Sequence, residues 1–385
     1  MFRLHLFNPW HDEALAAHSP YYTPTAAARR LEAAWGQLPL LWAGKGDCVG
    51  IFATRKGRPA KSDAVNCLAD TGSPLAQLPI VAFNHRGDAF WQDVSSICPW
   101  GWDALLVHRL RKAGAPERLL PDATRLEDIR RLSSRQTTAR LLPLMRSLPF
   151  PTIGHSTIAT TEAQVRQAAD DLAADAQGGK PGHMMGKALW SCSGRGVFST
   201  TTALSATSLQ RIRKLLQTQG GIEIEPLYQR VADFALEFEA DAEGRVRYMG
   251  LSLFHTSVRG AYTANHIAPE AYLIDLLNRK VGRDVSHEVA AAAQAAADHL
   301  TDLLDHRYSG PLGVDMMYVV PFPLSPYIIN PTTMAAQARL HPCVEVNLRR
   351  TMGAVALSLR DKLSNNLLKS SQIPLDMAEM WYFCL

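Results

Sequence analysis

The sequence predicts an α/β protein whose catalytic part is α+β, with a parallel-sheet domain at the N-terminus. Along roughly the first third of the chain, short apolar runs alternate with helical stretches, which is typical of a doubly wound parallel sheet. Further on, acidic and apolar residues alternate over Asp233–Glu239. The turn Asp241–Gly244 and the run Val246–Phe254 follow, which is the pattern of an antiparallel pair.

The length also bears on the organisation of the chain. A chain of 385 residues is longer than one compact core usually holds, so two or three domains are expected. We predict an N-terminal α/β domain over residues 1–130, a second domain over 131–228 and a third over 229–385.

In the N-terminal domain the apolar runs give the strands. Strands are expected at Arg3–Phe7, Leu38–Ala43 and Leu78–Phe83, and a helix at Thr23–Trp35 with Thr25 as its cap. Polar residues at Asn84–Asp88 follow the last strand, where such sheets place ligands. A plain polar turn is the alternative, and this stretch alone favours the turn.

Composition restricts the classes of function. Hydrophobic residues make up 47% and charged residues 20%, as in an ordinary soluble globular protein. The net charge of +4 is spread along the chain and favours neither nucleic acid nor membrane as a partner. The six cysteines form no C-x-x-C pair, so reduced thiols are expected. With no signal peptide and no long apolar run, we predict a cytoplasmic protein.

The stretch Glu345-Val-Asn-Leu-Arg349 carries the strongest chemical signal. In a strand, side chains alternate between faces, so Glu345, Asn347 and Arg349 are expected to share one face. Carboxylate and amide oxygens suit Mg²⁺, and an arginine beside them can hold a phosphate or a carboxylate. The alternative is a half-exposed amphipathic strand whose polar residues face water.

A second signal lies around Lys187. A strand that carries this lysine runs into the small-residue loop Ser191–Gly196, and a strand resumes at Val197. Glycines let the backbone approach a ligand closely and let amides point at phosphate oxygens. A hairpin turn that needs glycine for its backbone angles explains the same residues.

Two other nucleotide-binding motifs are absent or incomplete in this sequence. No G-x-x-x-x-G-K-[ST] sequence occurs, which excludes a P-loop. Gly194-Arg-Gly196 lacks the third glycine of a dinucleotide motif and does not lead directly into a helix, so that fold is weakly supported.

Two isolated charged residues, Asp315 and Arg135, are further candidates for a functional site. Asp315 is the one acid in the apolar run Gly310–Val320, where a carboxylate is costly without a partner. Arg135 lies in the first turn of a helix, where the helix dipole disfavours a cation unless an anion binds there. A solvated basic helix face is the simpler explanation for Arg135 alone.

In their order, these motifs resemble the ATP-grasp superfamily over about residues 130–353. The resemblance rests on Lys187 with its loop, Glu225–Tyr228, Asp233, Asp315 and the Glu345-x-Asn347-x-Arg349 strand. It implies a two-subdomain ATP-grasp fold, preceded by the N-terminal α/β domain that such ligases usually carry.

The resemblance also implies roles for individual residues. Lys187 would contact ATP phosphates, Asp233 the ribose, and Arg349 an acyl phosphate, while Arg135 would add a phosphate contact. The loop that closes over the phosphates would use Ser191, Ser193, Gly194, Arg195 and Gly196. The segment that reads adenine would be Glu223, Glu225, Leu227 and Tyr228. The ligands of Mg²⁺, for which Mn²⁺ could substitute, would be Asp315, Glu345 and Asn347.

The function implied is an ATP-dependent ligase that joins a carboxylate to an amine through an acyl phosphate. Both substrates would be small molecules, and a homodimer is compatible with the class. The polar stretch after the second antiparallel strand supplies candidate substrate contacts: His255, Arg259, Tyr262 and Asn265. A small-molecule kinase of the same fold and a non-catalytic nucleotide-binding protein are the alternatives.

Overall fold

The computed structural model describes residues 1–52, 80–83, 87–191, 196–256, 262–322, 337–367 and 381–384. The chain divides into two compact units, Met1–Arg130 and Arg131–Leu385. The predicted ligand stretch at Asn84–Asp88 lies largely outside the described residues, since 84–86 are not among them.

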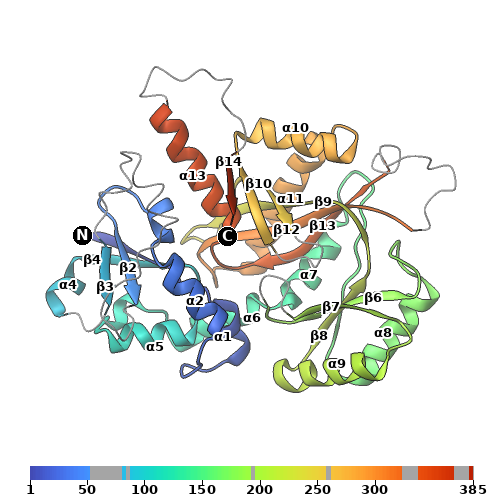
Figure 1. The fold of residues 1–385 in the computed structure, drawn as a ribbon, viewed down its shortest axis with the longest axis horizontal. Coiled ribbons are helices and arrows are strands. Elements are labelled where there is room, and N and C mark those ends of the chain that lie inside the picture. Colours follow the sequence, from blue (N-terminus) through green and yellow to red (C-terminus); the bar gives the residue numbers. More distant parts are fainter. Residues whose placement is uncertain are drawn as a thin grey trace. The chain divides into compact units, whose positions relative to one another are not determined.

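The first unit contains a parallel sheet, as predicted. Its strand order is β3-β2-β1-β4 and every neighbouring pair is parallel (Figure 1). The strands are β1 Phe2–Leu6, β2 Cys48–Phe52, β3 Ile80–Phe83 and β4 Val94–Pro99. Leu4 and Leu6 of β1 pack against Leu106 and Leu110, all of them buried, and give this unit its own core.

Helices flank this sheet. They are α1 His11–Ala17, α2 Ala26–Trp35, α4 Asp88–Asp93, α5 Ala104–Lys112 and α6 Ala123–Leu132, with short 3₁₀ turns η1 Leu38–Leu41 and η3 Glu117–Leu119. The Thr25 hydroxyl accepts a hydrogen bond from the Ala28 amide at the start of α2, so the predicted cap is confirmed.

The strand predicted at Leu38–Ala43 is wrong. Leu38–Leu41 forms the 3₁₀ turn η1, with Pro39 in its first positions, where the missing N–H of proline costs no hydrogen bond. All four residues of η1 are buried. The apolar run therefore indicated burial correctly and the type of element incorrectly.

The second unit contains a six-stranded sheet in the order β13-β12-β9-β10-β11-β14. All its neighbouring pairs are antiparallel, and Figure 1 shows α10, α11 and α13 beside it. Its strands are β9 Gln229–Ala240, β10 Val246–Thr256, β11 Tyr262–Ile267, β12 Gly310–Val320, β13 Arg339–Asn347 and β14 Trp381–Cys384. The helices are α7 Arg135–Met145, α10 Glu270–Val281, α11 Ser286–Leu304 and α13 Met352–Leu367.

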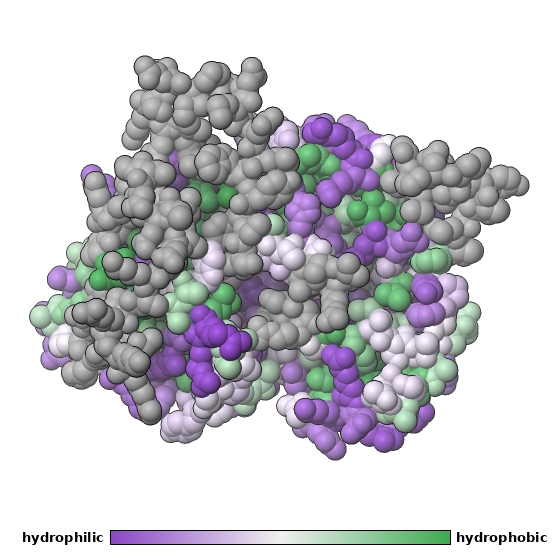
Figure 2. All heavy atoms as spheres, viewed as in Figure 1, coloured by the Kyte–Doolittle hydropathy of each residue, from purple (hydrophilic) through white to green (hydrophobic). Residues whose placement is uncertain are grey.

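A four-stranded antiparallel sheet, β5-β8-β6-β7, forms the rest of this unit. Its strands are β5 Thr157–Ala159, β6 His183–Ala188, β7 Val197–Thr201 and β8 Ile222–Pro226, and its helices are α8 Glu162–Ala174 and α9 Ala206–Gln219. Val165 and Leu172 of α8 and Ile212 of α9 form a core with Ile224 of β8. Figure 2 shows hydrophilic residues on the surface where α9 lies. Arg213 and Lys214 are among the exposed residues of this helix.

The mixed α/β prediction, with a parallel sheet first and antiparallel sheets later, is therefore confirmed. The predicted boundary at residue 228 falls between β8 and β9, and it stays a prediction. Within the described ranges, no helix has both the length and the apolar character needed to cross a membrane.

Candidate active site

The two sheets of the second unit line a common cavity of about 570 Å³. The four-stranded sheet contributes Lys187 and Glu225 to its wall, and the six-stranded sheet contributes Asp233, Asp315 and Glu345. These residues lie up to 158 positions apart in the sequence, from Lys187 to Glu345. The cavity therefore brings together the lysine strand and the C-terminal acids that the sequence singled out.

Lys187 is a buried cation that two carboxylates neutralise. It lies on β6 opposite Glu223 of β8, in antiparallel register. Its Nζ is 2.6 Å from Glu225 Oε1 and 3.9 Å from Glu223 Oε2. Burial raises the pKa of the Glu225 carboxyl to about 7, against the opposing effect of Lys187. A phosphate oxygen that entered the cavity would contact a lysine side chain whose orientation Glu225 already fixes.

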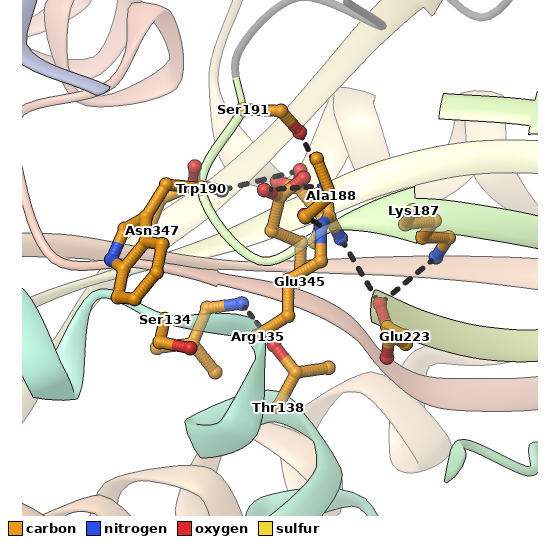
Figure 3. A network of polar contacts seen from close by, with 12 residues as sticks. Ser134, Arg135, Thr138, Lys187, Ala188, Trp190, Ser191, Glu223, Glu345 and Asn347 are labelled. Atoms are coloured by element: carbon orange, nitrogen blue, oxygen red, sulfur yellow. Dashed lines mark hydrogen bonds and ion pairs between the residues drawn. The ribbon is translucent and has the colours of Figure 1, made fainter. Parts of the chain in front are cut away.

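Arg135 links the two sheets. The Ser134 side chain caps α7 and the Arg135 guanidinium then extends into the cavity wall. Its Nε donates to the Ala188 carbonyl at 3.1 Å, and its Nη2 lies 2.7 Å from Glu345 Oε1 (Figure 3). Burial acts to lower the pKa of this guanidinium, but the carboxylates of Glu345, Glu223 and Glu225 raise it above its ordinary value.

Glu223 anchors this arrangement and does not line the cavity. It is fully buried, its Oε2 lies 3.4 Å from Arg135 Nη1, and its Oε1 accepts a hydrogen bond from Ser156 Oγ at 2.6 Å. The resemblance placed Glu223 in the segment that reads adenine. In the structure its carboxylate contacts cations and Ser156 behind the cavity wall.

The acids of the six-stranded sheet form the candidate metal site. Asp315 of β12 lies directly opposite Glu345 of β13 in the strand register. Asn347 Nδ2 donates to Asp315 Oδ2 at 3.3 Å. Burial and the neighbouring Glu345 charge together raise the pKa of Asp315 to about 7, against the opposing effect of Arg349. The two carboxylates thus repel each other, and a cation between them would relieve the repulsion.

These side chains fit a hard divalent cation. Two carboxylates and an amide oxygen suit Mg²⁺, which keeps waters and takes its remaining ligands from phosphates. Among the described residues, no three His, Cys, Asp or Glu side chains gather at one point, so a closed all-protein metal cage is absent there. The same oxygen ligands suit Mn²⁺.

Arg349 departs from its predicted position. β13 ends at Asn347, so Arg349 lies in a bend beyond the strand, and its face is not set by strand alternation. Its Nη1 donates to the Arg350 carbonyl at 3.2 Å. It is not among the residues that line the cavity, although its charge lowers the pKa of Asp315. The prediction of one shared face therefore holds for Glu345 and Asn347 only.

Pro226 at the end of β8 lines the cavity together with Leu227 and Tyr228, which follow it. The Leu227 carbonyl accepts a hydrogen bond from the Lys180 amide at 2.7 Å, so this backbone acceptor is engaged. Tyr228 is buried and packs edge-on against His341, with ring centroids 5.4 Å apart. These residues give one wall of the cavity an apolar character that a base could contact.

Asp233 lies at the cavity with two polar partners that the sequence did not reveal. Its Oδ2 accepts hydrogen bonds from Thr256 Oγ1 at 2.9 Å and from Arg230 Nη1 at 3.2 Å. Thr256 also lies 3.4 Å from Arg230 Nη1. The alternation of β10 could have indicated Thr256, because Phe254 and Thr256 share a face and both line the cavity.

The structure describes the two ends of the loop from Ser191 to Gly196, which was predicted to close over phosphates. Ser191 lines the cavity, with its Oγ 3.5 Å from Arg135 Nη2. Gly196 has a φ of +84°, and a Cβ there would come within 2.9 Å of Ala188 Cβ, so glycine is required at this position. Ser193, Gly194 and Arg195 lie outside the described residues.

Most of the proposed substrate contacts do not reach this cavity. His255 is not among the residues that line the cavity, and its Nε2 lies 2.8 Å from His266 Nε2. Asn265 is buried and bonded to Ser252, and the Tyr262 ring lies 6.2 Å from the Phe254 ring. None of the three lines the cavity, and Arg259 lies outside the described residues.

Comparisons with known proteins give similarity at the level of structure. No family model matches the chain, and no curated protein matches it. The chain is similar to the solved D-cycloserine synthetase DcsG, with 14% identity over 95% of this chain and 99% of that chain and a TM-score of 0.45. It is also similar to N5-carboxyaminoimidazole synthetase from Staphylococcus aureus in complex with ADP, with 10% identity, coverage of 91% and 71% and a TM-score of 0.45.

A third similar structure is the biotin carboxylase β,γ-ATP complex from Campylobacter jejuni, with 14% identity, coverage of 94% and 70% and a TM-score of 0.48. At these TM-scores no residue role is transferred from these proteins. Within the described residues, a parallel sheet is followed by two antiparallel sheets, as the resemblance implies. Two antiparallel sheets of one unit enclose a cavity that holds Lys187, Asp233, Asp315 and Glu345.

Proposed function

We propose that this chain is an ATP-dependent ligase that joins a small-molecule carboxylate to an amine, with release of ADP and phosphate. The observation that carries the proposal is the meeting of two phosphate-type cations, Arg135 and Lys187, with the cross-strand acids Asp315 and Glu345 in one cavity. A triphosphate with its divalent cation needs both charge types within a few ångströms. A cytoplasmic location and a homodimer stay predictions from the sequence.

The residues divide the work of binding. Lys187 and Arg135 would hold phosphate oxygens, Asp233 the ribose hydroxyls, and the wall of Leu227 and Tyr228 the base. Asp315, Glu345 and Asn347 would hold Mg²⁺. When bound, this ion neutralises negative charge on the phosphates that are transferred and released.

In the reaction, an oxygen of the substrate carboxylate forms a bond to the γ-phosphorus while the bond to the ADP oxygen breaks. The amine nitrogen then bonds to the acyl carbon, phosphate leaves, and the nitrogen loses a proton. The resemblance assigns the acyl phosphate to Arg349, although this residue is not among those that line the cavity, and it assigns the exclusion of water to the loop from Ser191 to Gly196. Water attack at that stage would turn the ligase into an ATPase.

The experiment is a screen of ADP release over paired small acids and amines in the presence of Mg²⁺. We expect ADP release that needs both partners, and we expect Glu345→Ala to lower it at least about 100-fold, because a group that holds developing phosphate charge is lost. Thr152→Ser, a conservative change away from the lining residues, serves as the control. ADP release at the original rate in Glu345→Ala would contradict the metal assignment.

The same screen distinguishes the other candidates. A phosphorylated product without any need for an amine would identify a kinase. Nucleotide binding without ADP release on any acid would identify a non-catalytic protein.

A further inference from the structure

We infer that Arg135 couples the binding of the divalent cation to the binding of the triphosphate, because it competes for the carboxylate that the cation requires. This inference rests on the proposed function and deepens it. It concerns the contact between Arg135 of α7 and Glu345 of β13, whose side chains lie 2.7 Å apart at Nη2 and Oε1 (Figure 3).

The geometry makes Arg135 a residue with two carboxylate partners of different character. Glu223, at 3.4 Å from Nη1, has a side chain that is 0% exposed, and Ser156 holds its other oxygen. Glu345 has a side chain that is 24% exposed and lines the cavity. Glu223 can therefore serve as a fixed anchor, whereas Glu345 is the partner that an incoming ion can reach.

The position of Arg135 on its helix supports an exchange of partners. Its backbone amide donates to the Leu189 carbonyl, and its Nε donates to the Ala188 carbonyl, so the side chain is held in place independently of Glu345. The Glu345 strand is also held independently, because the Val346 amide donates to Thr138 Oγ1 of α7 at 3.0 Å. The ion pair can separate without either element losing its own anchor.

The charges of these side chains explain why the cation and the triphosphate favour each other's binding. A cation that binds Glu345 through Oε1 replaces Arg135 as the partner of that oxygen, and this leaves the guanidinium with Glu223 and close to a second positive charge. A triphosphate alone would bring its negative charge toward Glu345 and Asp315. Bound together, the cation takes Glu345 and the phosphate takes Arg135, so each ligand satisfies the group that the other displaces. The two affinities are therefore linked, and the linkage is reciprocal.

The test measures Mn²⁺ binding by electron paramagnetic resonance, with and without the β,γ-imido analogue of ATP. In Arg135→Gln we expect Mn²⁺ alone to bind about tenfold more tightly than in the wild type, because its competitor for Glu345 is gone. We expect the analogue to bind more weakly, and its effect on Mn²⁺ affinity to shrink by about the same factor.

Lys187→Gln is the matched control. It removes an equal charge from the same cavity, but Lys187 pairs with Glu225 and not with Glu345. We expect it to weaken the analogue while changing the affinity for Mn²⁺ alone by less than about threefold, since the general field of a paired charge is small. Equal tightening of Mn²⁺ in both variants would overturn the inference, because it would reflect only the loss of positive charge.

Arg135→Lys provides a second test of the inference in case Arg135→Gln does not fold. A lysine keeps the charge but lacks the fork that reaches Glu223 and Glu345 together, so Mn²⁺ alone should bind more tightly than in the wild type. Mn²⁺ affinity that is unchanged or reduced in the folded Arg135 variants would overturn the inference. Failure of the wild type to bind Mn²⁺ and the analogue in any combination would instead overturn the proposed function.

Discussion

In the unit Arg131–Leu385, several buried ionisable side chains have pKa values that are shifted by burial and by a few neighbouring charges. His341 is a clear case, because it is 1% exposed and neither ring nitrogen has a hydrogen-bond partner among the described residues. Burial, together with the nearby charges of Lys187 and Arg146, lowers the pKa of His341 to about 3. The imidazole is therefore neutral in the folded protein at ordinary pH.

This shift predicts a loss of stability in mild acid. The unfolded chain binds a proton at His341 below pH 6.5 while the folded chain binds none until about pH 3. Stability is therefore full above the ordinary pKa and falls as the pH drops below it. Between pH 7.5 and 5.0 we expect the wild type to lose about 2 kcal/mol more than His341→Gln.

Urea unfolding of both proteins at the two pH values measures this difference, because the other titrating groups contribute equally to each. Gln has no proton to gain in this range, so it is the appropriate reference. An equal loss of stability in the wild type and the variant would show that His341 is not the group responsible.

The start of α13 depends on one hydroxyl. Thr351 Oγ1 accepts a hydrogen bond from the Ala354 amide at 3.0 Å and donates to Glu237 Oε2 at 2.7 Å. Glu237 is buried, and burial raises its pKa to about 8. Gly313 and Gly353 pack against the same carboxyl group, so β9, β12 and the start of α13 meet there.

We expect Thr351→Val to destabilise the protein by about 2–4 kcal/mol, since it removes a helix cap and leaves a buried carboxyl group without its partner. Thr351→Ser keeps the hydroxyl and should cost less than about 1 kcal/mol. Thermal unfolding of the two variants side by side provides the measurement. A loss in the serine variant as large as in the valine variant would assign the effect to packing of the methyl group.

The sequence predicted elements well where pattern and chemistry agreed. Alternation marked β9 and β10, and the glycine loop marked the β6–β7 hairpin, in which Lys187 pairs with Val197. The prediction from sequence failed where one pattern is compatible with two types of element. An apolar run such as Leu38–Leu41 signals burial in a strand or a helix alike, and β2 and β4 were not predicted. Alternation also could not show that β13 stops before Arg349.

The complete molecule brings together residues that no local pattern could pair. The sequence suggests Lys187, Glu345 and Arg135 as site residues from their own surroundings, but it does not show that Arg135 pairs with Glu223 and Glu345. Thr256 and Ser156 were not predicted, because their partners Asp233 and Glu223 lie elsewhere in the sequence. Arg230 was not predicted either, although its partner Asp233 is only three residues away. Tertiary contacts, and not residue type, selected them.

All the residues that line the cavity belong to Arg131–Leu385. We therefore expect a fragment of residues 121–385, which keeps α6 whole, to bind the Mg²⁺ complex of the ATP analogue within about tenfold of the full chain, a difference below roughly 1.4 kcal/mol. Isothermal titration calorimetry provides the comparison, with circular dichroism to confirm that the fragment folds. A folded fragment without affinity would assign part of the nucleotide site to residues 1–120.

The strand β14 has a consequence for how this protein is handled. It pairs antiparallel with β11 through Ala264 to Ile267 and completes that side of the six-stranded sheet. If proteolysis or truncation removed it, β11 would expose a row of unpaired amides and carbonyls that another chain could extend. Preparations that have lost β14 should therefore self-associate through strand addition. Dimers detected by chemical cross-linking would be the first sign of this loss.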